Sequence, residues 1–372
     1  MTATVNFNCL TDRDHHPTAD LARLATDHAA SPPSTAECPS RAPQLDCKQH
    51  SVNDNTLLEP VPVAAHDGLL ALFHTVPVVA LGEAHWLDQQ HRLIRELLFD
   101  ERFAEAVDAV VVEFGNALHQ PLIDRYLAGE DVAASELRRV WSECVGGWFS
   151  RAFESPVYAE FFETVRASRR TGRSERPRVL LGDPPFDPQV GTGAVERALG
   201  QRDEHLAGIV AQEVLVRRHR ALLVAGSGHL TRRSDLREGN VVQRLEREAP
   251  GCCTVVLPHY VFEDIAERRR ADIERLERKL ERWKPPALAL IHGTWLGEVD
   301  ASLYLSDTAG RLEPDGTEIE IRTPLLDDAG RALEHVSLAE VADAFLYLGP
   351  IASLTLAEPP AGRAVSPRGG PL

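Results

Sequence analysis

Short apolar runs alternate with amphipathic stretches along most of the chain, and this alternation predicts the fold. The first run, residues 78–81, contains only valine, alanine and leucine, which is typical of a short buried strand. Further runs of this kind begin at Ala109, Arg178, Ala221, Cys253, Ala287 and Ala344. Strands that alternate with helices predict an α/β fold, with a mainly parallel β-sheet flanked by helices.

Helical spacing of apolar residues appears between these runs. The first such stretch, residues 88–108, places Leu93, Ile94, Leu97 and Leu98 on one face. Residues 119–170 have the same spacing and predict a helical insertion between the second and third strands. Further helices are predicted at residues 192–218, 262–283 and 338–343.

The two ends of the sequence lack these patterns. Residues 1–55 are rich in Thr, Ser, Pro, Asp and His without sustained periodicity, so we predict a disordered leader. Residues 359–372 consist largely of Pro, Gly and Arg and predict a loose tail. The predicted organisation is therefore a leader (1–55), a single α/β domain (56–358) and a tail (359–372).

Charge and composition limit the partners and the compartment. The formal net charge is −16, which disfavours nucleic acid and anionic membranes as partners, because a protein that binds either of them needs a basic surface. No stretch approaches the roughly 20 apolar residues of a membrane span, and the N-terminus does not resemble a signal peptide. The six cysteines show no CxxC spacing, which predicts reduced thiols. We therefore expect a cytoplasmic protein that binds a small molecule or a peptide.

Acidic residues and histidines directly follow four of the predicted strands. Glu83 and His85 follow the first strand, Glu113 the second, Asp183 the third and His229 the fourth. The carboxyl ends of parallel strands lie at one edge of a sheet, where sites collect in this class of fold. Two imidazoles and two carboxylates at one edge can activate water as a general base, or bind a divalent cation with open positions.

Other candidates have an ordinary structural explanation beside the functional one. His259 and His292 follow later strands and could simply satisfy backbone carbonyls, and Asp183 precedes a proline, where aspartate favours a turn. Ser227 lies in Gly-Ser-Gly, which lacks the Gly-x-Ser-x-Gly spacing of a nucleophile elbow. The sequence also has no Walker loop and no GxGxxG motif. The histidines and carboxylates therefore carry the candidate chemistry.

These motifs resemble a known superfamily over residues 75–260. Gly82-Glu83-Ala84-His85, then Glu113 after an apolar run, then Gly226-Ser227-Gly228-His229 are similar to the erythromycin esterase, ChaN-like and Tiki (TraB) superfamily. Two Gly-x-x-His motifs with a Glu resemble the Tiki and TraB metalloproteases. A Gly-Glu-x-His start followed by His91 resembles the ChaN-like haem-binding proteins, and Arg202-Asp203 in a helix before His229 resembles the erythromycin esterases.

The resemblance implies roles for individual positions. The acid/base or metal-binding histidine of the superfamily falls on His85, its glutamates on Glu83 and Glu113, and its late histidine on His229; His85, Glu113 and His229 form the implied metal set. Erythromycin esterases usually have one more residue between the glutamate and the histidine, which argues against macrolide esterase activity. We therefore expect a separate bacterial branch.

Three hypotheses for the function follow. The leading one is a hydrolase that activates water with His85, His229, Glu83 and Glu113, with or without a divalent metal ion, on a small ester, amide or peptide. The second is a haem- or metal-binding protein without catalysis. Its candidate cofactor-binding residues are His91, Asp183 and Tyr260, with His85 as a further axial ligand. The third is a scaffold that binds a small ligand without reacting with it.

Overall fold

A computed structural model gives the fold of one unit of the chain, Thr56–Leu372. It describes residues 57–147, 152–170, 176–187, 192–233, 239–261, 263–305, 308–312, 318–322 and 335–357. The predicted leader and tail lie outside these residues. No helix among the described residues combines the length and the apolar character needed to cross a membrane.

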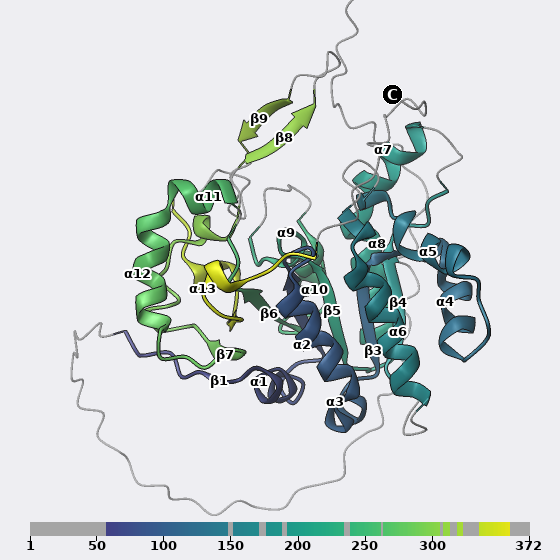
Figure 1. The fold of residues 1–372 in the computed structure, drawn as a ribbon, viewed down its shortest axis with the longest axis horizontal. Coiled ribbons are helices and arrows are strands. Elements are labelled where there is room, and N and C mark those ends of the chain that lie inside the picture. The colour runs from purple at the N-terminus through teal and green to yellow at the C-terminus, as the bar shows by residue number, and fades with distance from the viewer. Residues whose placement is uncertain are drawn as a thin grey trace, which may run out of the picture. The chain divides into compact units, whose positions relative to one another are not determined.

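The strands form an eight-stranded mixed sheet in which most neighbours run parallel (Figure 1). Six adjacent strands are parallel, whereas β7 runs antiparallel to β10 and to β1. Most residues of the central strands are fully buried, because helices cover both faces of the sheet. A strand buried on both faces requires apolar side chains in succession, which is why these strands are continuous apolar runs. In order across the sheet the strands are β1 (Val63–Ala64), β7 (Ala287–Leu290), β10 (Ala344–Tyr347), β6 (Cys253–Pro258), β2 (Val78–Glu83), β5 (Ala221–Gly226), β3 (Ala109–Asn116) and β4 (Arg178–Asp183).

Two helical layers pack on the sheet, because successive residues of a strand point to opposite faces. Val79 and Leu81 belong to one hydrophobic core and Val78 and Ala80 to the other. The first core is completed by α1 (Ala65–Leu72), α2 (Asp88–Phe99), α3 (Glu101–Ala106), α4 (Gln120–Leu127), α5 (Ala134–Ser142) and α6 (Pro156–Arg170). The second core is completed by α8 (Arg202–Val210), α9 (Ser227–Leu230), α10 (Val241–Glu248), α11 (Glu263–Arg268), α12 (Arg270–Leu280) and α13 (Leu338–Val341).

The predicted α/β class, the mainly parallel sheet and the helical insertion are confirmed, but several boundaries differ. The insertion between β3 and β4 is not helical throughout, since α4 is followed by Gly129 at a φ of 104°, which favours glycine, and α5 ends shortly before Gly146. The predicted helix over residues 192–218 is divided into α7 (Thr192–Gly200), α8 and a π-helical turn, Ala211–Leu215. The strands β1, β8 (Thr308–Leu312) and β9 (Glu318–Arg322) were not predicted, and β8 pairs only with β9.

Strand register places the predicted residues at one edge. Glu83, the last residue of β2, pairs with Gly226, the last residue of β5, so the loops after both strands begin side by side. On the other side of β5 lies β3, which carries Glu113 near its carboxyl end, and β4 ends next to it at Asp183. The carboxyl edge of four adjacent strands therefore holds the candidate site.

Candidate functional site

Glu83 is the centre of a buried hydrogen-bond cluster at the end of β2. Its side chain is fully buried, and its Oε1 accepts a hydrogen bond from the Tyr158 hydroxyl and lies 2.8 Å from His91 Nε2. Its Oε2 lies 3.3 Å from His85 Nδ1. One carboxylate thus fixes side chains from the loop after β2, from α2 and from α6, which is how the helical insertion contributes to the site.

The loop that carries His85 is held by a buried glutamine. Gln90 accepts a hydrogen bond from the backbone N–H of Ala84 and donates one to the carbonyl of Gly82. The next residue after His85, Trp86, has a φ of 67°, a left-handed conformation that costs a tryptophan on the order of 1–3 kcal/mol. The His85 ring packs edge-on against Phe153 at 5.4 Å between centroids, and its side chain is 36% exposed. The imidazole is therefore oriented while part of it stays open to solvent.

Glu113 is the centre of a second cluster, at the end of β3. The Arg202 guanidinium binds its Oε1, and His229 Nε2 lies 3.3 Å from the same oxygen. Its Oε2 accepts a hydrogen bond from the backbone N–H of Gly226 at 2.5 Å. Two cationic side chains and a backbone donor thus surround one buried carboxylate.

His229 lies between two carboxylates. Its Nδ1 lies 2.6 Å from Oδ1 of Asp203, a buried residue of α8, and its Nε2 faces Glu113. The His229 side chain is 27% exposed. Like His85, this imidazole is therefore held by buried carboxylates and is partly open to solvent. Asp203 fixes the ring orientation from the helix side, as acidic partners of functional histidines do.

Gly226 is the point at which the two clusters meet. A Cβ atom added at this glycine would lie 3.3 Å from His85 Nε2 and 3.4 Å from Glu113 Oε2. His85 and Glu113 therefore both lie close to the same backbone position, Gly226. The structure thus brings together all four predicted catalytic residues, Glu83, His85, Glu113 and His229.

The acids and imidazoles shift each other's pKa values. Burial opposes the charged form of Glu83, but the charge of His85 and the hydrogen bond of His91 outweigh burial and lower its pKa to about 2. Burial likewise opposes ionisation of Glu113, but the charges of His229 and Arg202 hold its pKa well below the usual range. Both carboxylates are therefore ionised at neutral pH.

The imidazoles shift in the opposite direction. Burial lowers the pKa of His85, but the charge of Glu83, whose Oε2 lies 3.3 Å from His85 Nδ1, overcomes burial and raises it above 6.5. Burial also opposes the charged form of His229, yet the charge of Glu113 and the hydrogen bond to Asp203 raise its pKa to about 10. At neutral pH His229 is therefore an imidazolium.

Asp183 anchors the helical insertion to the sheet. Its carboxylate accepts hydrogen bonds from the backbone N–H groups of Val145 at 2.5 Å and Gly146 at 3.4 Å, and Arg202 Nε lies 3.3 Å away. Burial outweighs these contacts and raises its pKa to about 7. Its polar contacts are thus made within the protein, and its place as a cofactor ligand stays a prediction.

Other predicted residues lie apart from the two clusters or behind them. His91 is 1% exposed and supports Glu83 from behind, and Tyr260 packs against the first hydrophobic core. His259 is completely buried after β6, where it contacts the Tyr304 hydroxyl and Glu277. His292 follows the antiparallel β7 and therefore lies at the opposite edge of the sheet, 3.0 Å from Asp343. It does not join the site.

Several residues of the site were not assigned a role from the sequence. Asp203 and Arg202 entered only through the resemblance to erythromycin esterases, and Gln90 and Tyr158 lie in ranges predicted only as helical, 88–108 and 119–170. Their apolar or charged neighbours gave no sign that they point to the strand ends. Gln90 is a buried glutamine in the first turn of α2. Its burial is the one feature of these residues that could have indicated a role in the site.

A divalent cation fits the implied metal set poorly. The Glu113 oxygen nearest His229 already binds the Arg202 guanidinium, so a cation there would lie beside a fixed positive charge. Among the described residues, the His/Cys/Asp/Glu atoms that gather within 4.8 Å of one another belong to Glu246, Cys252 and Cys253, on another part of the sheet. The set of His85, Glu113 and His229 stays a prediction, and we derive no step through a metal ion.

Haem fits no better with His91 as its axial ligand. The His91 Nε2 atom is engaged by Glu83 and the ring is 1% exposed, so iron could reach it only if this cluster opened. His85 is more accessible, but its ring packs against Phe153. His91 therefore fits the role of axial ligand poorly, and haem binding through His85 or Tyr260 stays a prediction.

Comparisons with known proteins give similarity of structure. No protein-family model and no curated protein matches the sequence. Similar solved structures include the erythromycin esterase EreC in its open conformation (12% identity, TM-score 0.43, covering 76% of this chain and 94% of that one). Another is ChaN of Campylobacter jejuni, in a structure of cofacial haem binding (14% identity, TM-score 0.33, 53% and 87%).

A third similar structure is a succinoglycan biosynthesis protein (9% identity, TM-score 0.48, covering 78% of this chain and 94% of that one). Erythromycin esterase and ChaN are also the names of two branches that the sequence motifs resemble. Likeness at this level says nothing of substrate or activity, so any function has to be argued from the residues of the site itself.

Proposed function

We propose that this protein is a hydrolase in which His85 activates a water molecule. One observation carries the proposal: two partly exposed imidazoles, His85 and His229, are each fixed by buried carboxylates at the same edge of the sheet. Acid–base catalysis needs oriented groups with different pKa values. His229, with a pKa of about 10, is protonated at neutral pH and cannot accept a proton from water, which leaves His85 as the candidate base.

The roles follow from the contacts. Glu83 faces Nδ1 of His85, which fixes the tautomer with its proton on Nδ1 and leaves Nε2 to accept a proton from water. Nε2 is the atom that approaches Gly226 and the Glu113 side of the site. His229, protonated and held by Asp203, supplies positive charge for the oxyanion that forms when water attacks a carbonyl, and a proton for the leaving group.

The supporting residues keep these charges in place. Arg202 balances Glu113, and Glu113 in turn stabilises the imidazolium of His229. Tyr158 and His91 hold Glu83, so that its carboxylate cannot rotate away from His85. The substrate class that this chemistry serves is a small ester, or an amide or peptide.

A substrate panel tests the proposal. Wild-type protein and His85→Ala are assayed against ester, amide and peptide substrates, with elemental analysis of the same preparations. We expect turnover of at least one ester by the wild type and a loss of roughly a hundredfold or more in His85→Ala, the usual contribution of a general base. Equal turnover by the two proteins, or none by the wild type across the panel, would contradict the proposal.

A further inference from the structure

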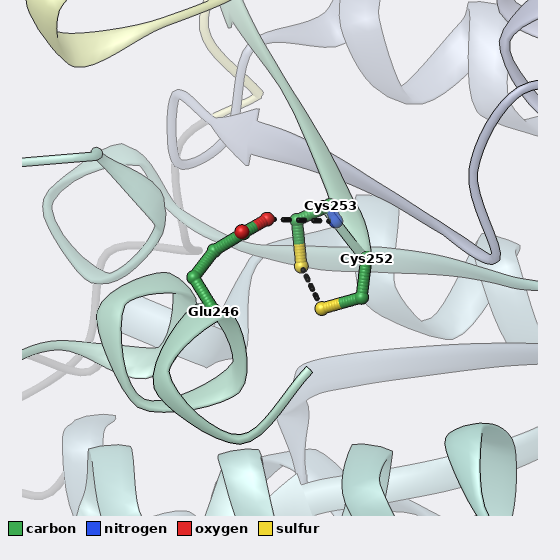
Figure 2. Close-up of side chains that lie close together, drawn as sticks. All are labelled: Glu246, Cys252 and Cys253. Carbon is green, nitrogen blue, oxygen red and sulfur yellow. Dashed lines mark hydrogen bonds between the residues drawn. The ribbon is translucent and has the colours of Figure 1, made fainter. Parts of the chain in front are cut away.

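Two adjacent cysteines and a glutamate form a compact group far from the candidate site. Cys252 and Cys253 stand at the start of β6, at the amino edge of the sheet, and Glu246 comes from α10 (Figure 2). Both cysteines are free and buried, at 5% and 2% exposure. Figure 2 shows the two thiols directed toward each other, with the Glu246 carboxylate beside Cys253. Nothing in the proposed hydrolysis uses these groups.

The sulfur geometry matches the span of two metal ligands. The two Sγ atoms lie 3.4 Å apart, far longer than a disulfide bond of about 2.05 Å. Two thiolates at about 2.3 Å from a tetrahedral zinc ion are about 3.8 Å apart, so a shift of a few tenths of an ångström would open the pair to that span. The thiols therefore need little movement to chelate one ion.

Glu246 is fixed in reach of the same point. Its Oε1 accepts a hydrogen bond from the backbone N–H of Cys253 at 3.0 Å, and its Oε2 accepts one from Gly251 at 2.6 Å. Each carboxylate oxygen has a second lone pair, which stays available to a cation. The Glu246 side chain is 21% exposed, which gives an ion a route from solvent. The Arg232 guanidinium lies 3.7 Å from Glu246 Oε1, but Asp343 at 2.7 Å balances its charge.

We propose that Cys252, Cys253 and Glu246 bind one thiophilic divalent cation, such as Zn²⁺, with water in the fourth position. Binding converts both thiols to thiolates and releases their two protons to solvent, so no oxidant or reductant is needed. Two thiolate ligands select a soft or borderline ion over Mg²⁺ or Ca²⁺. The ion would join α10 to the start of β6 and stabilise the folded chain.

Cadmium is the probe, because cadmium thiolates have a charge-transfer absorption in the ultraviolet. The starting protein for these tests, called the parent, carries Cys9→Ser, Cys38→Ser, Cys47→Ser and Cys144→Ala. Cys252 and Cys253 are then its only thiols. We expect one Cd²⁺ per chain, with the charge-transfer band, two protons released per ion, and a melting temperature that rises with Cd²⁺ concentration.

Variants of this parent separate the proposed ligands from the rest of the chain. Cys252→Ala and Cys253→Ala keep small apolar side chains in buried positions, and each should weaken Cd²⁺ binding by on the order of a hundredfold, while Glu246→Gln should weaken it by about tenfold. Glu248→Gln, on the same helix, is the matched control and should bind as the parent does.

The contradicting results are equally definite. A parent chain without the charge-transfer band, or affinity unchanged in Cys252→Ala, would overturn the site. An alanine variant that loses its cooperative unfolding transition cannot be used for this comparison. In that case proton release by the wild-type protein is the test, and fewer than two protons released per bound Cd²⁺ would also overturn the proposed site.

Discussion

Three buried carboxylates at the carboxyl edge of the sheet differ in charge because their neighbours differ. Glu83 faces two imidazoles and Glu113 faces an imidazolium and a guanidinium, so both have lowered pKa values. Among the described residues, Asp183 contacts Arg202 and two backbone donors, and burial raises its pKa to about 7. The neighbouring groups, rather than burial alone, therefore decide the charge of each acid. Glu83 and Glu113 are ionised and orient histidines, whereas Asp183 anchors a turn.

Glu83 should make the stability of the fold depend on acid pH. Its pKa is lowered from 4.5 to about 2, so its contribution is fully present above pH 4.5 and is lost as pH falls toward 2. A shift of that size corresponds to about 3 kcal/mol. The difference in unfolding free energy between wild type and Glu83→Gln should therefore be largest above pH 4.5 and shrink below it, measured by urea unfolding. The exposed Glu105→Gln is the control, and a difference that does not change with pH would speak against the ion-pair cluster.

Asp203 should set the charge of His229. Because the hydrogen bond from His229 to Asp203 helps to raise the His229 pKa to about 10, Asp203→Asn should lower that pKa toward 6.5. NMR titration of the imidazole measures it directly. Glu204→Gln removes the same charge from the exposed neighbour and should leave the His229 titration unchanged. An equal shift in both variants would mean that the contact itself has no role.

Elements built on continuous apolar runs could be predicted from the sequence, but strand direction could not. The strands β2, β3, β4, β5 and β6 lie where their Val- and Leu-rich runs predict, because strands buried on both faces need such runs. The run at β7, Ala-Leu-Ala-Leu, is apolar as well, yet this strand is antiparallel to β10. An apolar run reads the same in both directions, so the sequence could not show at which edge His292 lies.

Because His292 lies at the opposite edge of the sheet from His85, His292→Ala is a matched control for His85→Ala. Its side chain is 57% exposed and contacts Asp343, which also binds Arg232, at the edge away from the site. His292→Ala should therefore keep the hydrolytic rate of the wild type within about twofold, because exposed substitutions disturb the fold little. A rate loss comparable to that of His85→Ala would contradict the assignment of the site to the carboxyl edge.

The catalytic candidates were predictable for the same reason that the strands were. Glu83, His85, Glu113 and His229 each follow an apolar run within a few residues, so parallel pairing alone brings them together. Asp203 and Tyr158 come from helices, and their contacts depend on how α8 and α6 pack on the sheet. Helical spacing predicts that a residue faces inward, but not which strand end it meets.

At the scale of the whole chain, the leader should not contribute to folding. Residues 1–55 lack the apolar periodicity that offsets the loss of chain entropy on folding. Deleting residues 2–55 should therefore leave the melting temperature within about 2 °C of the wild-type value, since a 1 kcal/mol change would already shift it by about that much. A markedly lower melting temperature would show that the leader packs on the α/β unit.

The pH dependence of hydrolysis tests the central claim most directly. If His85 acts as the base and His229 as the acid, the rate needs His85 deprotonated and His229 protonated. The profile should therefore rise with a midpoint above pH 6.5 and fall near pH 10, and chelator should not change it.

The measurement is a pH–rate profile of the wild type and His85→Ala on the best ester of the panel. We predict that His85→Ala loses the acid limb along with most of its rate. An acid limb that persists unchanged in His85→Ala would contradict the account.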